Sequence, residues 1–106
     1  MSESYRVEFL PAAQADMVEI VRYISEELSS PAAAGALAEE FVRTADSLSV
    51  FLYAHPAYTP LRPLKHEYRK VLVKNYLMFF RIGEETKTVT VARVVYAARD
   101  YGNLLR

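Results

Sequence analysis

The residues best suited to chemistry lie in the second half of the chain, where cations alternate with tyrosines through runs rich in Val, Tyr and Phe. A guanidinium or ammonium group can bind a phosphate, and a tyrosine ring can stack on a nucleic-acid base. The cations are Arg62, Lys65, Arg69, Lys70, Lys74, Arg81, Arg93 and Arg99, and the tyrosines are Tyr68, Tyr76, Tyr96 and Tyr101. A surface of this composition is suited to a polyanion.

Strand alternation predicts which of these cations share a face of a sheet. In the first run, Tyr68, Lys70, Leu72 and Lys74 share one face, and Arg69, Val71 and Val73 share the other. Arg93 lies inside an apolar stretch, Val91–Val95. An Arg that faces a core needs a paired carboxylate, whereas an Arg on an open face can bind an anion.

Most cofactor and metal chemistries find no support in the sequence. There is no cysteine, and His55 and His66 have no partner at metal-ligand spacing, so we expect both to be solvated loop residues. Phosphate-loop and dinucleotide signatures are absent, and no serine lies in a nucleophile-elbow context. We therefore expect neither a cofactor nor a metal site.

Hydrophobic periodicity predicts the elements that position the cations. Alternation over Tyr5–Leu10 indicates a strand. Two helices follow, the second from Pro31 to about Leu52, with a loop containing Pro56, Pro60 and Pro63 after it. The expected buried stripes are Ala13, Met17, Ile20, Val21, Ile24 and Leu28 on the first helix, and Leu37, Phe41, Ala45, Leu48 and Leu52 on the second.

Three strands are expected after the loop, over roughly 68–74, 76–82 and 87–96. Their short connections, Lys74–Asn75 and Gly83–Glu85, join antiparallel neighbours. We predict an α+β domain over residues 1–106, ordered β-α-α-β-β-β, with a small antiparallel sheet and a helical hairpin packed on one face.

The formal net charge of zero conceals an asymmetry along the chain. Residues 1–61 carry nine acidic and three basic side chains, whereas residues 62–106 carry four acidic and ten basic. This distribution predicts a basic working face and an acidic back. No apolar stretch approaches the ~20 residues of a membrane span, and no signal peptide is recognisable, so we expect a cytoplasmic protein without membrane contact.

The order and spacing of several segments resemble the RelE/ParE superfamily of bacterial toxins. These segments are Ala15–Met17, Ile20–Ile24, the helix start at Pro31, Tyr68–Arg69, Asn75–Ile82, Arg93–Tyr96 and Arg99–Leu105. The resemblance covers nearly the whole chain. It implies a growth-inhibiting toxin of a type II toxin–antitoxin module, of the addiction or plasmid-stabilisation kind, neutralised by a cognate antitoxin.

The superfamily holds two activities. RelE-like members enter the ribosome and cut mRNA without metal, by attack of the ribose 2′-hydroxyl on the adjacent phosphate. ParE-like members poison DNA gyrase and do no chemistry of their own. We favour the ribosome-dependent endoribonuclease, with the gyrase poison and an inactive binding module as alternatives.

The resemblance assigns catalytic roles to Arg69, Arg99 and Tyr101, and we expect Lys65, Lys70, Lys74, Arg81 and Arg93 to bind nucleic acid. Two departures predict slow cleavage. Val71 stands where RelE-like nucleases often have a second lysine, and Leu77 stands near their next arginine. Convergence of Arg69, Arg99 and a tyrosine on one patch would favour the nuclease.

Overall fold

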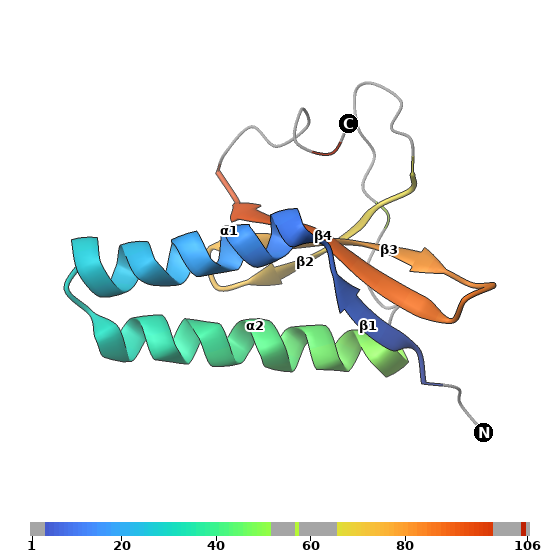
Figure 1. The fold of residues 1–106 in the computed structure, drawn as a ribbon, viewed down its shortest axis with the longest axis horizontal. Helices are drawn as coiled ribbons and strands as arrows, with labels where there is room; N and C mark the ends of the chain where they lie inside the picture. Colours follow the sequence, from blue (N-terminus) through green and yellow to red (C-terminus); the bar gives the residue numbers. More distant parts are fainter. Residues whose placement is uncertain (1–3, 52–56, 58–65, 99–104, 106) are drawn as a thin grey trace.

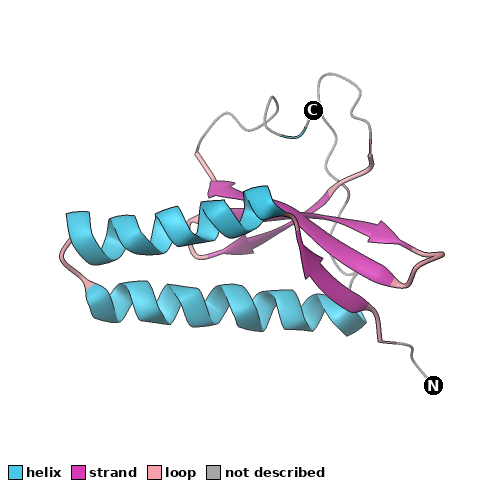
Figure 2. Cartoon of the chain, in the orientation of Figure 1, coloured by secondary structure: helices cyan, strands magenta, loops and turns pink. Residues whose placement is uncertain are grey.

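The computed structural model describes residues 4–51, 57, 66–98 and 105. A helical hairpin packs against a four-stranded sheet, which confirms the predicted α+β class (Figures 1 and 2). The elements are β1 Arg6–Phe9, α1 Pro11–Arg22, a π-helical turn η1 Tyr23–Glu27, α2 Pro31–Phe51, β2 Arg69–Val73, β3 Tyr76–Gly83 and β4 Thr88–Tyr96. Leu52 and the three prolines of the predicted loop lie outside the described residues.

The sheet has the order β1-β4-β3-β2. As predicted, β2, β3 and β4 are antiparallel neighbours. The first strand differs, because β1 pairs parallel to β4, with Arg6 opposite Thr88 and Phe9 opposite Val91. Parallel pairing needs a long connection, which the helices and the two hairpins provide. The sheet is therefore mixed, with β1 at one edge and β2 at the other.

The main core fills the space between the helices and one face of the sheet, which we call the helix face. Phe41 and Leu48 of α2 meet Met78 and Phe80 of β3 there, all nearly inaccessible to solvent. The predicted stripe of α2 is confirmed at Leu37, Phe41, Ala45 and Leu48. Burial of this apolar area is the main force that holds the hairpin on the sheet.

The predicted stripe of the first helix fails at its end. Ala13 is buried, and Met17, Ile20, Val21 and Ile24 pack against the core, but Leu28 is 58% exposed. The π-helical turn Tyr23–Glu27 explains this exposure. A π turn takes more residues than an α turn, so a residue placed at α-helical spacing rotates away from the core.

A bulge interrupts the alternation of β4. Arg93 pairs with Phe79 and Val91 with Phe80, which leaves Ala92 as an extra residue. As a result Val91 and Val94 both join the helix-face core, whereas Ala92 and Val95 join a second cluster on the opposite, open face. The bulge changes which side chains near the end of β4 can reach either face.

No helix within the described residues is long and apolar enough to cross a membrane.

Candidate functional site

Strand β2 divides the predicted cations between the two faces of the sheet. Val71 and Val73 pack on the helix-face core, and Tyr68 belongs to the open-face cluster, so the predicted alternation is confirmed. Arg69 stands opposite Phe80 and Lys70 opposite Phe79. The backbone thus directs Arg69 and Lys70 to opposite sides.

Arg69 and Arg81 nevertheless line one small pocket at the edge of the sheet. β2 begins opposite Phe80, so the last residues of β3 extend past it. The resulting notch holds a pocket of about 220 Å³, lined by His66, Glu67, Arg69, Arg81, Ile82 and Glu84. Two guanidinium groups from adjacent strands therefore meet around the sheet edge.

Carboxylates temper the charge of this pocket. Nη2 of Arg69 lies 3.6 Å from Oε1 of Glu67, and the Arg69 side chain is 20% exposed. Glu84 lines the same wall. The edge pocket is therefore a mixed site of cations and anions rather than a strongly cationic one.

A larger cleft adjoins the pocket on the open face. It encloses about 380 Å³ and is lined by Arg6, Glu8, His66, Arg81, Ile82, Gly83, Thr86, Thr88 and Thr90. Arg81 and His66 line both spaces. His66 is exposed, as expected for a loop histidine, and meets Tyr68 edge to face with ring centroids 6.2 Å apart.

Lys70 and Lys74 do not join this pocket or the cleft. Lys70 is half-buried at the second position of β2, on the side opposite Arg69. Lys74 is exposed in the β2–β3 turn with φ 57°, at the other end of the strand from Arg69. Arg69 and Lys70 therefore begin β2 on opposite faces, and Lys74 lies beyond its other end.

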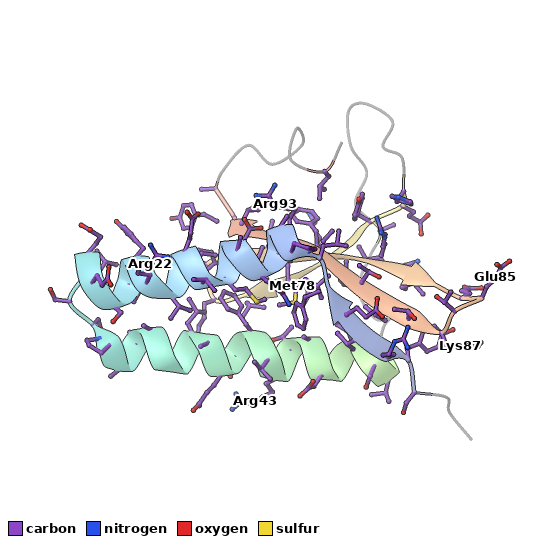
Figure 3. All side chains as sticks on the ribbon, viewed as in Figure 1. Arg22, Arg43, Met78, Glu85, Lys87 and Arg93 are labelled. Atoms are coloured by element: carbon purple, nitrogen blue, oxygen red, sulfur yellow. The ribbon has the colours of Figure 1, made fainter. Side chains whose placement is uncertain are left out.

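Arg93 is held in an ion pair with Asp16 of α1. Its Nε and Nη2 donate hydrogen bonds of 2.7 and 2.9 Å to the two carboxylate oxygens, and Val94 N–H donates a third, 2.9 Å long, to Asp16. These hydrogen bonds to Asp16 raise the pKa of Arg93, against the opposing effect of burial. Figure 3 shows Arg93 beside α1.

The sequence left open whether Arg93 is paired with a carboxylate or can bind an external anion, and the ion pair with Asp16 decides for the first. A partly buried Arg within an apolar stretch needs a carboxylate, and Asp16 supplies it from 77 residues away. Nothing in the local sequence singles out Asp16 among the nine acidic residues of the first half. The guanidinium of Arg93 is satisfied within the protein.

The remaining predicted site residues, Lys65, Arg99 and Tyr101, lie outside the described residues. Leu105 is described and is 4% exposed, packed in the open-face cluster. That cluster comprises Tyr68, Leu77, Phe79, Ala92, Val95 and Leu105, with Leu10 and Ala97 against it. The centre of the open face is therefore a second apolar core, and Leu77 belongs to it.

Three tyrosines gather at the other end of the sheet. Tyr76 packs edge to face on Phe41 at 6.1 Å and on Tyr96 at 5.8 Å. Burial raises the pKa of Tyr76, and the neighbouring phenols of Tyr96 and Tyr23 raise it further. Tyr23 and Tyr96 are each about half exposed, so this group combines core packing with an accessible aromatic surface.

Within the part of the chain that the structure describes, no three His, Cys, Asp or Glu residues are grouped so that they could hold a metal ion.

The sequence places the chain among the toxins of type II toxin–antitoxin systems. A family model described as the ParE toxin of the type II toxin–antitoxin system parDE matches residues 7–101. The chain belongs to this family, within the RelE/ParE superfamily. No curated protein sequence matches the chain.

Solved structures of such toxins share the fold. The chromosomal ParDE toxin–antitoxin system from P. aeruginosa matches with a TM-score of 0.70 at 16% identity, over 88% of this chain and 96% of that one. The RelBE2 toxin–antitoxin complex from Mycobacterium tuberculosis matches with a TM-score of 0.60 at 24% identity, over 92% and 95%. The archaeal RelE–RelB complex from Pyrococcus horikoshii OT3 matches with a TM-score of 0.59 at 12% identity, over 92% and 99%.

Proposed function

We propose that this chain is a growth-inhibiting toxin that acts in the cytoplasm by binding DNA gyrase, without chemistry of its own. One observation carries the proposal: the described cations do not converge on the centre of the open face. That centre is filled by apolar side chains, among them Leu77, Phe79 and Val95, which are at most 8% exposed. Side chains so deeply buried form a core, and they offer no group for proton transfer.

A metal-free ribonuclease has requirements that this geometry meets poorly. It needs an acid, a base and cations directed at the phosphate that develops charge. Val71 faces the helices, Leu77 lies in the apolar cluster, and Arg93 is paired with Asp16. These positions supply no cation to a common centre.

The family assignment supports the same choice. The matching family model is that of the ParE toxin, and the ParE-like members of the superfamily are the ones that poison gyrase. A binding mechanism also needs no particular residue at the positions of Val71 and Leu77.

A cognate antitoxin completes the proposal. Val18 of α1 and Val42 of α2 are 57% and 58% exposed. Residues of α2, Val42 among them, line a hollow of about 500 Å³. Exposed apolar side chains on a helical surface are suited to an amphipathic partner segment. We expect this segment to come from a small protein encoded beside the toxin and to cover the hairpin.

The ribosome-dependent endoribonuclease remains the second candidate, and one observation favours it. Arg69 and Arg81 share the edge pocket, and Arg99 and Tyr101 would have to join them there. If the chain cuts mRNA, Arg99→Ala abolishes growth arrest while the protein stays folded. If Arg99→Ala unfolds the protein, the residue is structural and this assignment fails.

Induced expression in bacteria tests the proposed function. Expression from a tightly repressed promoter should arrest growth and switch on a DNA-damage response before protein synthesis falls, and co-expression of the antitoxin should restore growth. Arrest of translation first, without DNA damage, would favour the endoribonuclease instead. Normal growth at a verified level of folded protein would refute both.

A further inference from the structure

We infer that the cleft at the β3–β4 end of the open face is a binding site for a phosphate group, centred on Arg81. The inference does not rest on the proposed function, because the site lies apart from the apolar centre of the open face and needs neither gyrase nor the ribosome to be tested. It rests on one cation that has no partner within the described part of the chain, and on the polar surface around it.

Arg81 is partly buried, and its side chain has no partner among the described residues. Its side chain lies on the open face, because every second residue of β3 points to the same side and Leu77 and Phe79 belong to the open-face cluster. Among the residues that the structure describes, none forms an ion pair or hydrogen bond with its guanidinium group, in contrast to Arg69 and Arg93. A partly buried guanidinium without a protein partner is suited to an external anion.

The strands beside Arg81 supply hydrogen-bond donors. Thr90 stands opposite Arg81 on β4, and Thr88 stands opposite Gly83. The Thr88 hydroxyl donates to Thr86 O at 3.1 Å, whereas within the described residues no partner is found for the Thr90 hydroxyl. Thr90 can therefore donate to a phosphate oxygen beside Arg81.

Gly83 lines the cleft without a side chain. A Cβ atom built there would come within 2.7 Å of Thr86 Oγ1. That hydroxyl donates instead to Gly83 O at 3.3 Å, across the turn that joins β3 to β4. Glycine at this position therefore allows the Thr86 hydroxyl to pack against β3 at the wall of the cleft.

Arg6 supplies a second cation from the far wall. Arg6 lies on β1 and pairs with Thr88 of β4, so it is two strand spacings, or roughly 10 Å, from β3. Its Nη2 lies 2.9 Å from Oε1 of Glu8, with the two side chains 71% and 50% exposed. A pair so exposed contributes little to stability, so Arg6 can exchange Glu8 for a phosphate at small cost.

The charge balance fixes the class of ligand. The cleft holds two guanidinium groups and one carboxylate, and the edge pocket adds the Arg69–Glu67 pair and Glu84. The cleft alone is positive by one charge, and the cleft and edge pocket together are neutral. This balance favours one phosphate group beside Arg81, whose guanidinium has no partner among the described residues. It does not favour a polyanion bound along its length. The phosphate can be free, or it can be one unit of a nucleic-acid backbone.

Titration of the purified protein, followed by amide NMR shifts at constant ionic strength, tests the site. Sodium phosphate should shift the amide signals of Gly83, Thr88 and Thr90 with saturation. Arg81→Gln should weaken binding about tenfold, because a charge-assisted hydrogen bond is lost. Glu8→Gln should tighten it, since Arg6 is released. Arg43→Gln, the same charge change on the outer side of α2, should leave it unchanged (Figure 3).

A single-stranded oligonucleotide of about ten units distinguishes the two sources. If it shifts the same amides at lower concentration than phosphate does, the site takes a backbone phosphate. If only inorganic phosphate does so, the site takes a free phosphate group. The inference is overturned if neither probe shifts these amides. It is also overturned if Arg81→Gln, shown by circular dichroism to be folded, binds phosphate as well as the native chain.

Discussion

The carboxylate of Asp16 on α1 joins the guanidinium of Arg93 on β4 by two hydrogen bonds and accepts a third from Val94 N–H. β1 stops pairing with β4 at Val91, so the edge of β4 loses its strand partner just before Val94. There the Asp16 carboxylate accepts the hydrogen bond of the Val94 N–H in place of a strand partner. The pair fixes α1 to the sheet beside the bulge at Ala92, immediately before the chain leaves β4.

Loss of this carboxylate should destabilise the fold. Asp16 and Arg93 have side chains only 13% and 23% exposed, so Asp16→Ala leaves a poorly solvated cation and an unpaired backbone N–H. We expect the free energy of unfolding to fall by about 2–4 kcal/mol, measured by chemical denaturation. Asp46→Ala, at an exposed position of α2, should change it by less than about 0.5 kcal/mol. Equal effects of the two substitutions would show that the pair is not structural.

Phe41 is the central side chain of the main core. It is 1% exposed and contacts Tyr76 edge to face. Phe41→Ala should lower the free energy of unfolding by roughly 3–5 kcal/mol, through lost burial and the cavity that remains. The neighbouring Val42→Ala removes an exposed side chain and serves as the control in the same denaturation series, with little expected change. A loss below about 1 kcal/mol for Phe41→Ala would contradict the packing described.

Adjacent positions of β2 test which face each side chain occupies. Val71 packs on the helix-face core, whereas Leu72 is 62% exposed. Val71→Lys should therefore destabilise by about 1–3 kcal/mol, because an ammonium group would be forced toward apolar side chains. Leu72→Lys should be nearly neutral in thermal unfolding. The reverse order would mean that β2 is shifted by one residue.

Stability at high pH should depend on Tyr76. The pKa of Tyr76 is raised above its ordinary value of 10.0 in the folded protein, first by burial and then by Tyr96 and Tyr23. A raised folded-state pKa means that folding favours the protonated phenol. The stabilisation is complete below pH 10 and is lost as the pH rises through the folded-state pKa. Urea titrations at successive pH values should show this fall in the native chain and a shallower fall in Tyr76→Phe. An identical pH dependence would contradict it.

Local signals in the sequence predict much of the fold. Periodicity identifies both helices and the three C-terminal strands, and the short turns set the antiparallel pairs. Alternation also predicts that Arg69 and Lys70 point to opposite sides. These features depend on neighbouring residues, so the sequence records them directly.

Two of the features that sequence reasoning missed depend on distant partners. The parallel pairing of β1 with β4 joins the two ends of the chain, and the Asp16–Arg93 contact spans 77 residues. Ala92 carries no mark of a bulge, and Tyr23–Glu27 carries none of a π turn. The edge pocket could not be predicted either, because Arg69 and Arg81 meet only where β3 extends past the start of β2.

The most direct test of the central claim is a cleavage assay with purified DNA gyrase and supercoiled plasmid, run beside a ribosome-bound mRNA reaction in EDTA. Our account predicts that the toxin traps gyrase on cleaved plasmid, that added antitoxin prevents this, and that the mRNA stays whole. Intact plasmid, together with mRNA cut on the ribosome and spared when the target 2′-hydroxyl is replaced by hydrogen, would contradict the gyrase mechanism and establish the endoribonuclease.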